Sequence, residues 1–201
     1  MRLQTLLLAG VIAVASTTSP VAGAGAPPFT FESARVTIDG TSNVHEWTAS
    51  TSDVRLTAVE TNGLAPSAPA EQLLQPGALT GLDVTIPAVS LKSPKDGIDK
   101  NMHKALKVQQ HPEIRFHLRS LTHTAGDAYQ ALGTLTIAGV EKDTTLNLQV
   151  VRKGAQLGVT GTTDVLMTDF GVAPPKALMG MVRANPKVVI TLEVVLAGPV
   201  S

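Results

Sequence analysis

The sequence contains no cysteine among its 201 residues. It can therefore form no disulfide and use no cysteine nucleophile, and we expect no lipid anchor on an N-terminal cysteine. Stability then has to come from an ordinary hydrophobic core. A single domain of this length buries roughly 70% of the surface that its unfolded chain exposes, so a core of that kind is sufficient.

Aromatic residues and an excess of one charge are also missing. Phe, Trp and Tyr make up 3% of the chain, and 16 Lys and Arg balance 16 Asp and Glu, which gives a pI of about 7.0. Proteins that bind nucleic acids usually carry a basic stripe, and single-strand binders add aromatic side chains that stack on bases. We therefore expect no nucleic-acid partner.

No apolar run reaches the ~20 residues that a membrane-spanning helix needs. Near the N-terminus, residues 3–15 are apolar apart from Gln4 and Thr5, Arg2 precedes them, and Ala22-Gly23-Ala24 fits a signal-peptide cleavage pattern. This predicts a signal peptide over residues 1–24 and a periplasmic or secreted domain over residues 25–201 without a stable membrane span. The alternative is an N-terminal anchor that is retained.

Motifs of catalysis, nucleotide binding and metal binding are absent too. The sequence has no G-x-S-x-G elbow, no P-loop, and no H-x-x-x-H or H-E-x-x-H pair among its five histidines. We therefore expect a protein that is not an enzyme and has no metal site and no cofactor. One alternative stays open, a hydrolase or isomerase that uses His45 with Glu46.

The sequence does contain many segments in which every second residue is apolar. In one of them Ile114, Phe116 and Leu118 alternate with Arg115 and His117, which is the pattern of a half-buried strand. Pairs such as Asp39-Gly40, Asn62-Gly63 and Ala138-Gly139 separate these segments and favour turns. The pattern predicts about eight antiparallel strands. From the residues alone, a closed barrel and a two-sheet sandwich both fit it.

Two segments depart from the alternation. Residues 63–77 are rich in Pro and Ala, which indicates a flexible loop. Residues 97–110 have apolar side chains at helical spacing, with Ile98, Met102 and Leu106 on one face, and Pro112 follows. This predicts a short amphipathic helix that packs as a lid over one end of the fold.

Trp47 and a cluster of methionines are the candidate binding residues. Trp47 is the only tryptophan and follows His45-Glu46; it serves either as a core anchor or as part of an apolar pocket. Met167, Met179 and Met181 are three of the five methionines. Methionine fills gaps in cores, and it also suits an adaptable channel for lipid.

Three motifs resemble the YceI-like family. Residues 133–146, Gly-Thr-Leu-Thr-Ile-Ala-Gly-Val-Glu-Lys-Asp-Thr-Thr-Leu, are similar to its G-x-L-T-I-x-G-V-x-K-x-x-x-L hairpin, residues 112–116 to its P-x-I-x-F strand, and residues 169–172 to its D-F-G-I element. The resemblance covers about residues 31–197. Residues 100–104 depart from the family's R-D-x-H-L and keep its histidine, His103.

The resemblance implies an antiparallel, lipocalin-like β-barrel of about eight strands with one short helix as a lid. It also implies that the protein binds, sequesters or carries a long apolar lipid, a polyisoprenoid or isoprenoid quinone, in a tunnel in the periplasm. We expect these residues to line the tunnel: Trp47, Leu106, Ile114, Phe116, Leu135, Met167, Phe170 and Met179. The alternative is a barrel with a packed core that acts as an envelope interaction or stress-response module. The oligomeric state stays open, a homodimer included.

Overall fold

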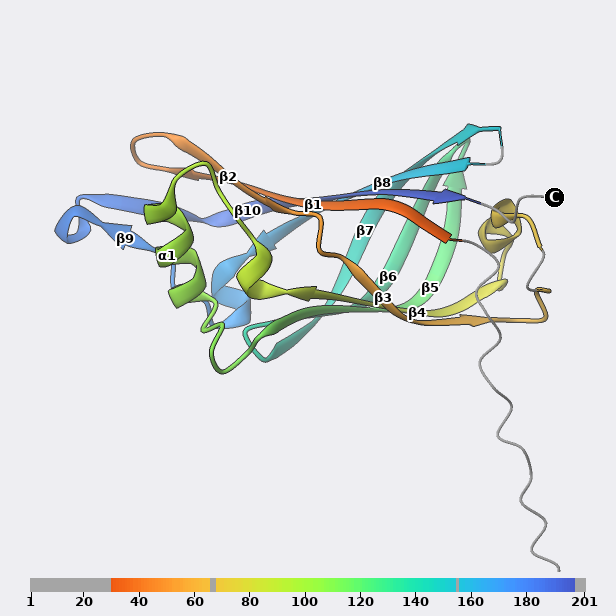
Figure 1. Ribbon diagram of the computed structural model, residues 1–201, viewed down its shortest axis with the longest axis horizontal. Helices are drawn as coiled ribbons and strands as arrows, with labels where there is room; N and C mark the ends of the chain where they lie inside the picture. The colour runs from red at the N-terminus through yellow and green to blue at the C-terminus, as the bar shows by residue number, and fades with distance from the viewer. Residues whose placement is uncertain (1–29, 66–67, 155, 198–201) are drawn as a thin grey trace, which may run out of the picture.

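The computed structural model describes residues 30–65, 68–154 and 156–197 of the chain (Figure 1). The expected signal peptide, residues 1–24, lies outside the described residues. The described part is mostly one curved antiparallel sheet with a single α-helix, which confirms the expected all-β barrel. No helix in the described ranges is both long and apolar enough to cross a membrane.

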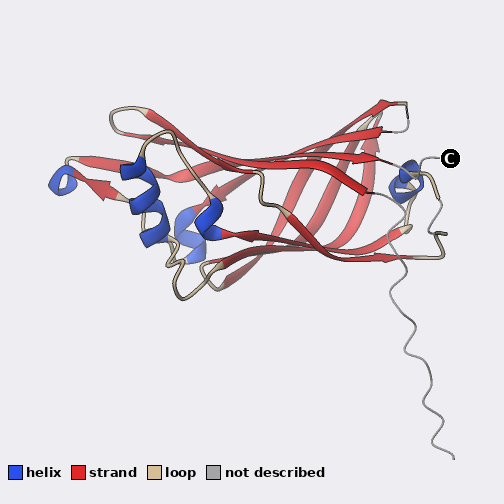
Figure 2. Cartoon of the chain, in the orientation of Figure 1, coloured by secondary structure: helices blue, strands red, loops and turns tan. Residues whose placement is uncertain are grey.

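The elements follow one another along the chain in this order: β1 (Thr30–Ser42), β2 (Glu46–Thr51), β3 (Arg55–Thr61), η1 (Ala70–Leu74), β4 (Leu79–Pro87), η2 (Ala88–Ser90), α1 (Asp96–Ala105), β5 (Glu113–Ala125), β6 (Ala128–Ile137), β7 (Val140–Lys153), β8 (Gln156–Leu166), η3 (Met167–Phe170), β9 (Lys176–Ala177), η4 (Leu178–Gly180) and β10 (Val182–Ala197). The α1 helix lies across one end of the barrel, and η1 lies at the opposite end (Figures 1 and 2).

The strands pair in the order β2-β1-β10-β8-β7-β6-β5-β4-β3, and β9 pairs with β10. The two ends of this path, β2 and β3, are consecutive in the chain. The short segment between them therefore connects the two edge strands of the sheet. Ser50 also exchanges two backbone hydrogen bonds, of 2.8 and 2.9 Å, with Lys92 in the segment after β4. This bridge satisfies part of the β2 edge and helps the sheet curve round on itself.

The sheet has ten strands where the sequence predicts about eight. Two short features are difficult to predict from alternation. One is the break at residues 52–54, where Thr51 Oγ1 accepts a hydrogen bond from the Asp53 N–H and the chain turns between β2 and β3. In addition, β9 has only two residues, too few for alternation to reveal.

The helix and the Pro-rich loop also differ from expectation. The α1 helix ends at Ala105, earlier than predicted, and Lys107 takes a left-handed backbone conformation with φ of 53°. Residues 63–77 are not all loop: they contain η1, whose Ala70 and Leu73 are buried. This short helix covers the end of the barrel opposite α1, so its apolar side chains pack where sequence alone indicates only flexibility.

The alternation fixes which side chains point inward. Along β6 the buried residues are Tyr129, Ala131, Gly133, Leu135 and Ile137, every second position. Because successive side chains in a strand point to opposite faces, the residues between them face outward. The pairing register between strands places the inward-facing residues of neighbouring strands beside one another around the barrel.

The interior is divided lengthwise. Near η1 the buried residues Ala70, Leu73, Tyr129, Val150 and Leu157 form one packed cluster. Near α1 a larger cluster of buried side chains draws on β1, β4, β5, β6, β8 and β10 together with α1 and η3. The cluster at the α1 end surrounds an apolar cavity, whereas the cluster at the η1 end is packed.

Candidate functional site

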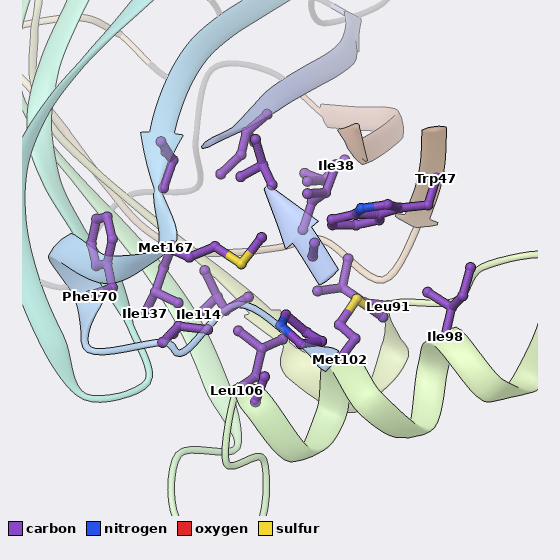
Figure 3. Close-up of a pocket in the computed structure, with 18 of the residues that line it drawn as sticks. Ile38, Trp47, Leu91, Ile98, Met102, Leu106, Ile114, Ile137, Met167 and Phe170 are labelled. Carbon is purple, nitrogen blue, oxygen red and sulfur yellow. The ribbon is translucent and has the colours of Figure 1, made fainter. Parts of the chain in front are cut away.

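An apolar cavity of about 220 Å³ occupies the half of the barrel that carries α1 (Figure 3). Its wall comes mainly from inward-facing Val, Ile, Leu, Phe and Met side chains of the strands, of α1 and of η3. Four of its few polar residues, Ser42, His45, Asn101 and Lys176, belong to elements at the α1 end. A fifth polar residue, Thr163, lies on β8. The site is therefore an apolar pocket whose polar residues lie mainly at the α1 end.

Trp47 is positioned at this mouth by Gly40, its partner across the β1–β2 pairing. The indole lies over the Gly40 backbone, where a Cβ atom would come within 2.2 Å of Trp47 Cζ2. Its Nε1–H donates a hydrogen bond of 3.2 Å to the Thr41 carbonyl oxygen. This contact satisfies the polar atom of the ring, so the apolar face of Trp47 is free to line the cavity.

The α1 helix is held across the cavity by a small polar network. The Ser93 N–H donates to Asp99 Oδ1 at 2.6 Å, Lys92 Nζ lies 3.7 Å from Asp99 Oδ2, and His103 Nε2 donates to the Leu91 carbonyl oxygen at 2.9 Å. Burial alone would raise the pKa of the Asp99 carboxyl, but the Ser93 hydrogen bonds and Lys92 lower it below its ordinary value. The network turns the apolar face of α1, with Met102, toward the cavity.

A tight turn brings the segment after β8 into the cavity. Gly171 takes a left-handed conformation, with φ of 64°, and its N–H donates to the Thr168 carbonyl oxygen at 3.1 Å. The neighbouring residues Met167, Phe170 and Val172 all line the cavity as a result. Glycine fits the turn because it pays no Cβ penalty there.

The hairpin between β6 and β7 packs against the strand that enters β5. A Cβ on Gly133 would lie 2.5 Å from Phe116 Cζ, and a Cβ on Gly139 would lie 2.4 Å from His111 Cε1. Each glycine therefore makes room for a ring from the other segment. Two of the motifs read from the sequence meet in space here, and they place Phe116 and Leu135 side by side on paired strands.

Seven of the eight side chains expected to line the tunnel surround this cavity, namely Trp47, Leu106, Ile114, Phe116, Leu135, Met167 and Phe170. Met179 does not: its side chain is fully exposed in η4, outside the barrel. An apolar run in the sequence does not tell which way a loop projects, and this one projects away from the cavity.

The cavity also has walls that were not singled out from the sequence. They are the inward-facing residues of β1, β4 and β10, among them Val36, Ile38, Val84, Ile86, Val188, Ile190 and Leu192. All of them lie in alternating strand segments. The alternation was thus a sufficient signal for their direction, although not for the presence of empty space beside them.

The polar alternative has little geometric support. The His45 and Glu46 side chains are both exposed, and no hydrogen bond joins them in the part of the chain that the structure describes. Over the same residues, no group of three or more His, Asp or Glu side chains is arranged to hold a metal ion. The His103 ring is used by the α1 network described above.

Comparison with known proteins gives one family and several related folds. The family model described as the YceI-like domain matches residues 29–196. No curated protein sequence matches the chain. Among solved structures, BcnA from Burkholderia cenocepacia has a TM-score of 0.64 at 17% identity, covering 81% of this chain and 95% of its own.

Two further structures have the same fold. The YCEI protein of Campylobacter jejuni gives a TM-score of 0.56 at 20% identity, over 76% of this chain and 85% of its own. A polyisoprenoid binding domain from Saccharophagus degradans, implicated in plant cell wall breakdown, gives 0.57 at 12% identity, over 86% and 99%. At these identities the likeness concerns the fold alone.

Proposed function

This chain belongs to the YceI-like family, and from that premise we propose that it binds a long apolar lipid, a polyisoprenoid or isoprenoid quinone, in the cavity beneath α1. It holds or carries this lipid in the periplasm and does not act as an enzyme. One observation carries the proposal: the barrel keeps an apolar space of about 220 Å³ at one end while its other end is packed.

The size of the space favours a ligand over a packing defect. An engineered apolar cavity of about 150 Å³ stays dry and binds a molecule as small as benzene. The cavity here is larger, at about 220 Å³, and is lined almost wholly by carbon and sulfur atoms. A barrel whose only role was to present a packed scaffold would lose dispersion contacts by leaving it empty.

The energetics favour a chain over a small apolar molecule. Each buried methylene contributes about 0.8 kcal/mol, so an isoprene unit contributes about 4 kcal/mol. Association costs about 4–15 kcal/mol, and a micromolar complex needs about 8 kcal/mol net. About three to six buried isoprene units close this balance. Since a cavity of about 150 Å³ holds one benzene molecule, a chain of this length fills the cavity of about 220 Å³ and extends into its mouth.

The geometry also supports one orientation of the ligand. The packed cluster around Val150 and Leu157 closes the η1 end, so the apolar tail would point toward Phe116 and Leu146. A polar headgroup would then remain at the mouth, beside His45, Asn101 and Lys176. The structure of the polyisoprenoid binding domain from Saccharophagus degradans supports this choice of ligand class through the shared fold.

The experiment uses the single tryptophan. The protein is purified from a bacterial host without detergent, and an organic extract is analysed by mass spectrometry for isoprenoid lipids. Delipidated protein is then titrated with isoprenoid alcohols of increasing chain length while Trp47 fluorescence is followed. We expect a co-purified isoprenoid and a response that strengthens with chain length. A lipid-free extract together with unchanged Trp47 fluorescence over the whole series would refute the proposal.

A further inference from the structure

The β9–η4–β10 hairpin carries the two most exposed large apolar side chains among the described residues. Met179 is fully exposed and Met181 is 68% exposed. The hairpin projects beyond the barrel at the same end as α1 (Figures 1 and 2). Exposed apolar side chains gathered at one protruding point mark an interaction site more often than scattered ones do.

The neighbouring β1–β2 loop is tied to this hairpin. Asn43 Nδ2 donates to the Met181 carbonyl oxygen at 2.8 Å, and the Arg183 N–H donates to Asn43 Oδ1 at 2.8 Å. The next residue, Val44, is 60% exposed. We refer to Val44, Met179 and Met181 as the apolar tip. Asn43 braces the two loops, so the tip is a built feature rather than two unrelated turns.

The backbone at Met179 does not favour a methionine. Its φ of 53° and ψ of 29° place it in the left-handed region, which is costly for any side chain and which glycine adopts freely. The side chain makes no compensating burial, because it is fully exposed. Met179 therefore does not contribute to folding stability through its side chain. This favours a role for the side chain in an interaction with another surface.

The charges around the tip are positive. From Phe170 to Leu192 the chain has no acidic residue and three basic ones, Lys176, Arg183 and Lys187. Lys187 pairs with Asp164 at 2.8 Å. Lys176 and Arg183 have no acidic partner within the described ranges, and Arg183 Nε donates instead to the Gly180 carbonyl oxygen at 2.9 Å. The adjacent loop contributes one acid, Glu46.

The tip is continuous with the mouth of the cavity. Pro175, Lys176, Val182 and Ala184 of the hairpin segment line the cavity, and so does His45 of the β1–β2 loop. A surface that engages the tip would therefore also face the opening through which an apolar chain must pass.

From these observations we propose that the apolar tip inserts Val44, Met179 and Met181 into the interface of an anionic phospholipid bilayer, with Lys176 and Arg183 against the headgroups. Apolar side chains flanked by cations are the combination that such interfaces attract. Docking in this orientation would let an isoprenoid chain leave the bilayer directly into the cavity. The direction of that transfer rests on the function proposed above; the docking itself does not.

The test measures co-sedimentation of the full protein with vesicles of phosphatidylethanolamine and phosphatidylglycerol, and with vesicles of phosphatidylcholine alone. We expect binding to the anionic vesicles that weakens with added salt. The M179S/M181S variant should lose about tenfold in partition coefficient. V151S is the matched control, because Val151 is also 60% exposed but lies on β7 near its end at Lys153, and it should bind like the parent.

A second variant separates docking from folding. M179G removes the exposed side chain and relieves the left-handed strain, so it should melt no lower than the parent protein while binding anionic vesicles less. Parent protein that fails to sediment with anionic vesicles, or M179S/M181S protein that sediments as well as V151S protein, would overturn the docking proposal. So would a self-association, measured by analytical ultracentrifugation, that M179S/M181S abolishes, since the tip would then be a contact between two copies.

Isoprenoid loading of the cavity is measured separately from vesicle binding. Organic extracts of M179S/M181S and parent protein, purified alike, are compared by mass spectrometry after incubation with a soluble isoprenoid alcohol. Equal loading with lost vesicle binding supports docking as a separate function. Absence of lipid from both proteins removes the proposed ligand while leaving the vesicle result to decide the docking.

Discussion

The indole of Trp47 stacks over the backbone of Gly40, its cross-strand partner, with no space between them for even a methyl group. The glycine on β1 therefore determines where the ring on β2 lies. Since the Trp47 N–H is already bonded to Thr41, displacing the ring would break this hydrogen bond as well as reshape the mouth of the cavity.

We predict that G40A moves the Trp47 ring and weakens ligand binding. The added methyl would lie 2.2 Å from Trp47 Cζ2, and overpacking of this kind costs about 1–3 kcal/mol. Fluorescence emission of the single tryptophan reports the movement, and urea unfolding reports the stability. G97A is the control, because a Cβ at Gly97 meets nothing within 4 Å. An emission spectrum of G40A identical to that of the parent would contradict the placement.

Two valine-to-phenylalanine substitutions distinguish the open end of the barrel from the packed end. Val188 lines the cavity, whereas Val150 lies in the packed cluster near η1. We expect V188F to fill cavity space, melt near the parent temperature and lower isoprenoid affinity by about tenfold or more. We expect V150F to lose about 1–3 kcal/mol of stability, because its neighbours leave no room. Thermal melts and Trp47 titrations measure both.

The stability and the isoprenoid affinity of V188F test different parts of the proposal. If V188F were as destabilised as V150F, the cavity would be too small or too rigid to accept a ligand. If V188F bound isoprenoid as tightly as the parent, the ligand would lie elsewhere on the protein.

The sequence predicts which side chains point into the barrel better than it predicts where the barrel holds a cavity. Alternation placed Ile114, Phe116 and Leu135 inside the barrel because a strand turns every second side chain the same way. The same alternation continues through Leu146 and Val150 on β7, yet Leu146 borders the cavity and Val150 is packed. Which half is filled depends on what closes each end.

The two end caps of the barrel differ in how well the sequence predicts them. The apolar face of α1 was readable from its helical spacing, but η1 lies in a Pro-rich stretch and its burial depends on contacts distant in sequence. Met179 was misplaced for a related reason. Its direction follows from the left-handed turn at η4, which leaves no pattern in the residues around it.

Asp99 should make the α1 network depend on pH. The pKa of Asp99 is lowered in the folded protein, so its ionised form is bound more favourably there than in the unfolded chain. Its contribution is therefore present above the unfolded value of about 3.9 and is lost as the pH falls through the folded value. We expect the stability difference between parent and D99N to be largest near neutral pH and to shrink as the pH falls below the unfolded value of about 3.9.

Urea unfolding at several pH values measures this difference. D96N is the control, because Asp96 is exposed in the same first turn of α1. A difference between parent and D99N that stays constant from neutral to acid pH would show that the Asp99 charge contributes nothing to the closure of α1.

His111 and Gly139 should be energetically coupled, since the imidazole occupies the space that a Cβ on Gly139 would take. G139A lowers the stability for two reasons. The left-handed backbone, with φ of 79°, costs about 1–2 kcal/mol for a residue with a Cβ, and the His111 ring must also move. G154A isolates the first cost, because Gly154 has φ of 58° and nothing within 4 Å. We expect G139A to be more destabilising than G154A, and H111A to remove most of that excess in the double variant. If the changes in unfolding free energy of G139A and H111A simply added, the contact between Gly139 and His111 would contribute nothing to stability.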